Sequence, residues 1–162
     1  MQKNEQSTPR KGIKEKLAIF IATGFYSGYF PLAPGTIGTL IAIPIYLLIS
    51  RFNSIIYYSI ITIVLFIAGI FVSSIAIKKF RRKDPSPVVL DAIVGFLVAM
   101  FFIEMTWWRL VAAFFLFRFF DIVKLFPAGA VEEIGKGFGI MADDIVAGIY
   151  ANLILQLAIR IF

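Results

Sequence analysis

The stretch IIYYSIITIVLFIAGIFVSSIAI, residues 55–77, decides the class of the fold. Its 23 residues carry no charge, and a transmembrane helix needs about 20 predominantly apolar residues. Arg51 stands before the stretch, and five basic residues follow it between Lys78 and Lys83. Charges are therefore confined to the two ends of the stretch. This pattern predicts a helix that crosses a membrane.

The composition of the whole chain also favours a membrane environment. Of its 162 residues, 60% are apolar, against about 45–50% in ordinary soluble domains. A water-soluble protein of this composition would expose large apolar patches and aggregate. The length suits a single domain. We therefore expect a basic tail with an amphipathic start over residues 1–16, followed by one all-α, multi-pass membrane domain over residues 17–162.

Other apolar stretches predict further helices at Thr39–Ser50, Val88–Ile103, Trp107–Phe120 and Gly139–Ile159. The segment before the first of them, residues 22–38, contains four glycines and two prolines. It cannot form an unbroken helix exposed to lipid, because the freed backbone groups would lack hydrogen-bond partners. We expect a broken, re-entrant segment there, buried against protein.

The sixteen basic residues indicate the orientation of the chain. Ten of them lie in two clusters, residues 3–16 and 78–83, which flank apolar segments. Such clusters anchor a protein to anionic lipid at the cytoplasmic surface, and they do not favour nucleic acid as a partner. The helix ends expected on the other side of the membrane have one basic residue each, Arg51, Arg109 and Arg160. The asymmetry predicts five crossings, with the N-terminus in the cytoplasm.

The chain contains no cysteine and no histidine. A cysteine nucleophile, a Ser-His-Asp triad and an imidazole or thiolate zinc site are therefore excluded. Any catalysis must depend on carboxylates, hydroxyl groups, lysine, arginine and a bound hard metal ion.

On this topology, seven acidic residues fall near the cytoplasmic interface: Asp84, Asp91, Asp121, Glu132, Glu133, Asp143 and Asp144. Asp91 lies inside an apolar run, where an ionised side chain costs about 2.5–3.5 kcal/mol near the centre of a membrane. Such a residue is expected to have a function. Asp84 precedes Pro85, so capping of a helix is an equally good explanation of it.

Asp121 has basic neighbours on both sides. Arg118 and Lys124 are each three residues away, on neighbouring positions if this segment is helical. The three residues can form a salt-bridge cluster at the interface. Alternatively they form a phosphate site, in which the cations bind the anion and Asp121 binds a metal ion.

The stretch GKGFGIMADDIVAG, residues 135–148, has three alternating glycines before a predicted helix whose first turn carries Asp143 and Asp144. Glycine lets a backbone approach a ligand closely, and a helix N-terminus attracts anions. Acidic residues in a first turn also favour the helix dipole, which is a purely structural explanation. Carboxylates from several helices suit Mg²⁺, a hard ion that keeps water ligands for phosphate chemistry.

Four stretches resemble, in order, the motifs of the phosphatidylglycerophosphatase A family. They are ATGFYSGYFPLAPGTIGTL (22–40), DPSPVVLDAIVGF (84–96), FRFFDIVKLFP (117–127) and GKGFGIMADDIVAG (135–148). The resemblance implies a Mg²⁺-dependent phosphatase on the cytoplasmic face of a bacterial membrane. Its substrate would be the phospholipid phosphatidylglycerophosphate, and its products phosphatidylglycerol and inorganic phosphate.

The resemblance also implies the site residues. Its acids are Asp84, Asp91, Asp121, Asp143 and Asp144, and among these we expect Asp84, Asp91, Asp143 and Asp144 to bind the metal ion. Its polar positions for phosphate or head-group contact are Thr36, Thr39, Arg118 and Lys124. Glycines that would shape the backbone around the substrate are Gly35, Gly137 and Gly139.

One position departs from the family pattern. The second motif usually has Asp-Glu where this chain has Asp91-Ala92, and alanine can neither bind a metal ion nor accept a proton. Either this protein works without that glutamate, or the alanine is an inactivating substitution. The intact motif around it favours an engineered change.

Two mechanisms and two other functions are compatible with these residues. Hydrolysis can proceed by direct attack of water or through an aspartyl-phosphate. Intramembrane acids and a broken helix are also typical of small ion- or proton-coupled transporters, and a non-enzymatic membrane scaffold could carry the same acids at its interface.

Overall fold

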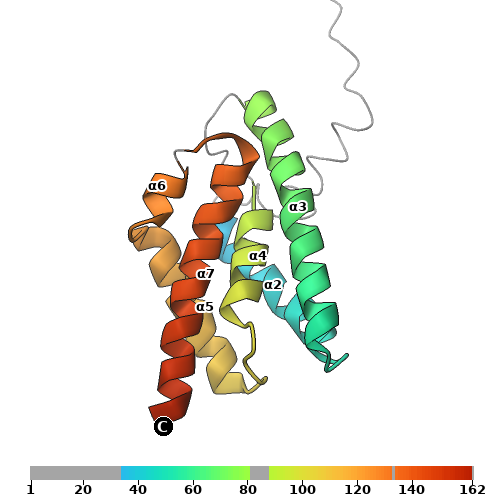
Figure 1. Ribbon diagram of the computed structural model, residues 1–162, viewed down its shortest axis with the longest axis vertical. Helices are drawn as coiled ribbons and strands as arrows, with labels where there is room; N and C mark the ends of the chain where they lie inside the picture. Colours follow the sequence, from blue (N-terminus) through green and yellow to red (C-terminus); the bar gives the residue numbers. More distant parts are fainter. Residues whose placement is uncertain (1–33, 81–87, 133, 162) are drawn as a thin grey trace, which may run out of the picture.

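The structure, a computed structural model, describes residues 34–80, 88–132 and 134–161 (Figure 1). Within these ranges every regular element is a helix, which confirms the all-α prediction. The helices are α2 (Pro34–Ser50), α3 (Ile55–Phe80), α4 (Leu90–Ala99), α5 (Trp107–Val123), α6 (Ala128–Glu132) and α7 (Lys136–Ile161). The predicted tail, the first part of the re-entrant segment and Asp84 lie outside the described residues.

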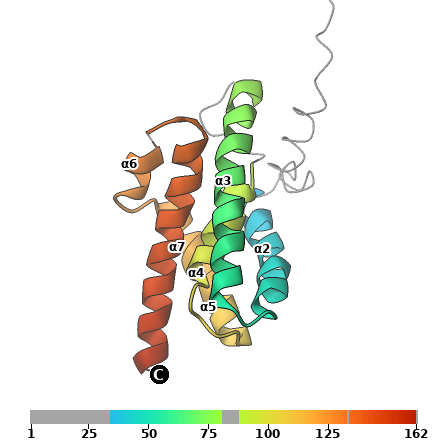
Figure 2. The same cartoon turned by 45° about the vertical axis from the view of Figure 1, so that its right-hand side comes forward.

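Helix α4 is the centre of the bundle. It contacts α2, α3, α5 and α7, and Figure 2 shows it behind α3, between α2 and α7. Its apolar side chains are almost completely buried, including Val94, Phe96 and Leu97 at 0% exposure. The other long helices therefore surround a short central one.

Two of the described helices are long and apolar enough to cross a membrane. One contains Ile55–Ile77 and the other Gly137–Ile161, so the span predicted at residues 55–77 has the required length. On α3, Ile56 and Phe71 are both 67% exposed, while Asp143 and Asp144 on α7 are buried. Apolar side chains outside and acidic side chains inside are the arrangement expected in lipid.

Helix α4 is shorter than the predicted span Val88–Ile103. Its ten residues are about 15 Å long at 1.5 Å per residue, half of a hydrocarbon core of about 30 Å. The chain leaves the helix in a turn that contains Phe102, whose φ is 59°. An apolar run shows that a segment is buried, but a tight turn within it can still end the helix.

Helix α2 begins earlier than predicted. Residues 34–38 were expected in the broken segment, but they form its first turn. Pro34 stands at the first helical position, where its missing N–H has no intrahelical partner to lose. The re-entrant prediction for residues 22–33 falls outside the described residues.

Helix α7 also begins earlier than predicted, at Lys136, so Gly137 and Gly139 are helical and are not part of a loop. Gly135, with φ 82°, makes the preceding turn. Gly137 packs against the backbone of α3 at Ile70, and its N–H donates to the hydroxyl of Ser74 (3.1 Å). The alternating glycines therefore combine a turn with close helix packing.

The backbones of α4 and α7 touch at two glycines. A Cβ on Gly95 would stand 2.6 Å from the carbonyl oxygen of Asp144. A Cβ on Gly148 would collide with the carbonyl oxygen of Gly95. Only glycine allows this approach, which brings the two helices together beside the buried acids.

We predict that Gly148→Ala destabilises the protein, because the added methyl group meets a backbone atom that cannot rotate away. Overpacking of this kind costs about 1–3 kcal/mol, which thermal unfolding in detergent will show as a lower melting temperature. Gly129→Ala in α6 is the matched control, since nothing lies within 4 Å of the added carbon. Equal melting temperatures for the two variants would contradict the close packing.

Candidate active site

Four acidic side chains from three helices come together at one end of α4. Asp91 lies in the first turn of α4, Asp121 near the end of α5, and Asp143 and Asp144 on α7. The carboxyl group of Asp144 shares a hydrogen bond with that of Asp121 and interacts electrostatically with those of Asp91, Asp121 and Asp143. Residues far apart in the sequence thus form one cluster.

The cluster needs positive charge to be stable. Asp143 is 7% exposed and Asp144 is 5% exposed, so water cannot screen their repulsion. Neighbouring buried carboxyl groups are stable together only if one of them is protonated or a nearby cation balances their charge. Two cations are at hand: Arg118 forms an ion pair with Asp121, and the ammonium of Lys124 lies 2.8 Å from Asp143.

Helix α5 provides both of these cations at its C-terminal end. Arg118 and Asp121 are three residues apart, on neighbouring positions of the helix surface. Lys124 is the capping residue, and its left-handed backbone, with φ 46°, takes the chain out of the helix. From there its side chain reaches the neighbouring helix α7.

The first turn of α2 closes one side of Arg118. A Cβ on Gly35 would stand 2.6 Å from a terminal nitrogen of the guanidinium group, so glycine leaves the room that Arg118 occupies. The Nε of Arg118 is buried and has no hydrogen-bond partner in the described part of the protein. A buried donor without a partner is costly, and an anion is a suitable acceptor for it.

The remaining predicted positions support helix packing. Thr39 is completely buried, and its hydroxyl donates to the carbonyl of Gly35 (2.8 Å). Thr36 lies partly buried in the same first turns of α2, and Gly139 is buried in the first turn of α7. Ala92 is 2% exposed, and its Cβ lies 3.1 Å from where a Cβ on Gly38 would be.

The four carboxyl groups are not arranged as a set of metal ligands. In the part of the chain that the structure describes, which omits Asp84, no group of three or more acidic side chains is arranged so that it could hold a metal ion. Two of the four carboxyl groups are instead bound by Arg118 and Lys124. Their chemistry still suits a hard cation, because all of the donors are carboxylate oxygens.

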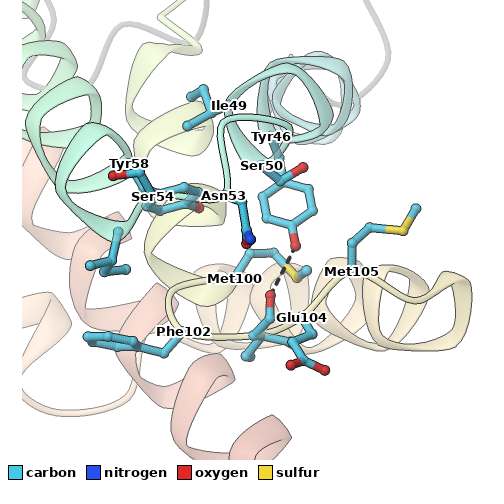
Figure 3. Close-up of a pocket in the computed structure, with 12 residues that line it drawn as sticks. Tyr46, Ile49, Ser50, Asn53, Ser54, Tyr58, Met100, Phe102, Glu104 and Met105 are labelled. Carbon is cyan, nitrogen blue, oxygen red and sulfur yellow. Dashed lines mark hydrogen bonds between the residues drawn. The ribbon is translucent and has the colours of Figure 1, made fainter.

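A cavity of about 620 Å³ lies at the opposite end of α4, where Ser50, Asn53 and Met100 are among its lining residues (Figure 3). Glu104 is the only charged side chain among the described residues that line it. A phosphate group needs cations around it, so this cavity is not a second candidate for phosphate chemistry.

Comparison with known proteins identifies the family. The family model of phosphatidylglycerophosphatase A matches residues 20–159. The chain belongs to the phosphatidylglycerophosphatase A family. This membership makes it a lipid phosphatase, a hydrolase of phospholipid metabolism. No solved structure matches the chain.

Relatives of the chain carry the names of two different phosphatase activities. Phosphatidylglycerophosphatase A of Haemophilus influenzae is 35% identical over 83% of this chain and 84% of its own. That of Escherichia coli is 34% identical over 83% and 79%. A Bacteroides thetaiotaomicron protein, provisionally named a phosphatidylinositol-3-phosphatase, is 37% identical over 88% and 93%.

The sequence interpretation missed Asn152 of α7. Its side-chain amide donates to the carbonyl groups of Ala99 (2.9 Å) and Phe101 (2.7 Å), at the end of α4. A signal was present, because a polar amide inside an otherwise apolar spanning helix usually binds another segment.

We predict that Lys124→Met lowers the melting temperature of the protein in metal-free detergent. The buried charge of Asp143 is then less well compensated, at a cost of about 1–3 kcal/mol. Adding Asp143→Asn to the same variant should restore most of the loss. Arg51→Met, a change at an exposed cation, is the control; an equal loss there would contradict a specific ion pair.

Proposed function

We propose that this protein hydrolyses the terminal phosphate of phosphatidylglycerophosphate to give phosphatidylglycerol and inorganic phosphate, with Mg²⁺ as cofactor. The observation that carries the proposal is the convergence of four acids and two cations beside one end of α4, in a chain of this family. The relatives from Haemophilus influenzae and Escherichia coli bear the name of this activity.

The basic residues would receive the phosphate. Phosphoryl transfer requires positive charge on the oxygens of the transferred group. Arg118 has a buried Nε that can donate to an anion, and its planar group suits phosphate. Lys124, whose side chain is 36% exposed, would exchange its contact with Asp143 for one with the substrate.

The acids would hold the metal ion once the cations have moved to the phosphate. Asp91, Asp143 and Asp144 are the proposed ligands, with Asp121 beside them and Asp84 as a further ligand from outside the described residues. A Mg²⁺ ion held there would supply positive charge beside the phosphate and help to orient a water molecule. Asp121, beside these ligands, would accept the proton from that water. We propose direct attack of water, with an aspartyl-phosphate as the alternative mechanism.

The lipid character of the substrate agrees with the position of the cluster. We place the protein in the bacterial cytoplasmic membrane with five apolar helices, α2, α3, α4, α5 and α7, of which α4 is surrounded by the others. The cluster and the N-terminus then lie on the cytoplasmic side, at the depth of the head groups. A lipid can bring its phosphate to Arg118 while its acyl chains remain in the bilayer.

The Bacteroides relative supports a second candidate substrate, a phosphoinositide. Both lipids present a phosphate monoester on a polyol, so the same cations can bind either. A transporter is not favoured, because the family is one of phosphatases and the clustered acids occupy a single end of α4. A scaffold needs neither the buried acids nor their cations.

The central test is release of inorganic phosphate from phosphatidylglycerophosphate in mixed micelles, with and without Mg²⁺. We expect release only with Mg²⁺, and a loss of at least about 100-fold in Asp144→Asn, since that change removes one charge from the proposed site. Phosphatidylinositol 3-phosphate in parallel reactions identifies the preferred lipid. Phosphate release that persists without Mg²⁺ would reject the metal-dependent mechanism.

The role of position 92 has a test of its own. We expect Ala92→Glu to raise Mg²⁺-dependent release by orders of magnitude, because the motif resemblance implies a glutamate there, and Ala92→Gln to leave it unchanged. Since Ala92 is buried against α2, the melting temperatures of both variants must be measured with the rates. Equal rates for the chain and Ala92→Glu, with both folded, would show that the glutamate is dispensable here.

A further inference from the structure

The C-terminal end of α4 and the segment that follows it, residues 100–103, accept hydrogen bonds from side chains of three other helices. Because this end is buried and the helix stops there, its last carbonyl groups need donors from elsewhere in the protein. Tyr58 of α3 donates to Leu97 (2.6 Å). Tyr46 of α2 donates to Ile103 (3.1 Å), the bond drawn as a dashed line in Figure 3.

Asn152 of α7 makes the remaining two contacts and is itself oriented. Its amide nitrogen donates to Ala99 and Phe101, while its amide oxygen accepts from Gln156 one turn later (2.8 Å). The bond from Gln156 fixes which side of the amide faces α4. Through Asn152, α7 is therefore hydrogen-bonded to the end of α4.

The same face of α7 carries the acids. Asp144, Gly148 and Asn152 follow one another at intervals of four residues, so they lie along one side of the helix. The carbonyl oxygen of Asp144 packs against Gly95, and Gly148 packs against the same residue. On α4, Asp91 is one turn before Gly95. The contacts at the glycines fix the distance between the helices, and Asn152 adds two directional bonds at the end of this interface.

We infer that Asn152 is a positioning residue for the acid cluster: by binding the end of α4 it sets where Asp91 stands relative to Asp144. This inference rests on the proposed function. Without the amide, α4 can slide or rotate against the smooth glycine contact, and Asp91 moves with it. A misplacement of about 1 Å in an active site can lower the rate about 100-fold.

The test compares Asn152→Leu, which has a similar volume and no donor, with Asn152→Gln, which keeps the amide. Leu153→Ala, at a neighbouring residue that is 58% exposed, is the matched control. Each protein is assayed for kcat and KM in phosphate release, and for the Mg²⁺ concentration that gives half of the rise in melting temperature. The Ala92→Glu background is used if the unmodified chain releases no phosphate.

We expect Asn152→Leu to lower kcat by at least about 10-fold, to change KM by less than threefold and to raise the half-effective Mg²⁺ concentration. Asn152→Gln should recover part of the loss in kcat and part of the shift in the half-effective Mg²⁺ concentration. Leu153→Ala should change neither of these quantities. If Asn152→Leu does not fold, Gln156→Leu frees the amide more mildly and should shift both quantities in the same direction.

A lower melting temperature with unchanged kcat and Mg²⁺ response would overturn the inference, since it would make Asn152 a purely structural residue. Failure of the proposed function is distinguishable. In that case neither background releases phosphate from either lipid, while the Mg²⁺ response of melting still reports on Asn152.

Discussion

The constraint on which the structure depends is that α4 is short and buried along its whole length. A helix that ends in an apolar interior leaves carbonyl groups without water, and each must find a donor in the protein. Tyr58 and Asn152 donate to the carbonyl groups of Leu97 and Ala99 at this end, and Tyr46 donates to Ile103 in the segment that follows it. Helices α2, α3 and α7 are therefore linked through the end of one central element, and the position of Asp91 at its other end depends on that link.

The electrostatics of the site follow from the same arrangement. Because α4 brings Asp91 into the bundle, the acid meets Asp121 and Asp144 where little water can screen them. Such a group of charges needs cations, and Arg118 and Lys124 at the end of α5 provide them. Under the proposed function, the contacts of Arg118 and Lys124 with these acids would be replaced by contacts with the phosphate, and a metal ion would take their place beside the acids.

Most residues of the candidate site could be predicted from the sequence. The helix ends and packing contacts that position these residues could not. The uncharged run at 55–77 predicts a spanning helix from its length and composition, and α3 is a helix long and apolar enough to be one. Asp91 and Asp144 stand out because charges are rare in apolar segments. The end of α4 was not predictable in the same way, since an apolar run continues through the turn at Phe102. The glycines before Asp143 suggested a loop because loop and close helix packing both select glycine, and only the contact of Gly137 with α3 separates the two.

The central claim is that Asp91 and Asp144, from different helices, belong to one metal site. The most direct measurement is binding of Mn²⁺, as a spectroscopic substitute for Mg²⁺, followed by electron paramagnetic resonance in the purified protein. The account predicts bound Mn²⁺ that Mg²⁺ displaces, loss of that binding in both Asp91→Asn and Asp144→Asn, and retention in Glu104→Gln at the opposite end of α4. Unchanged Mn²⁺ binding in the two aspartate variants would contradict it.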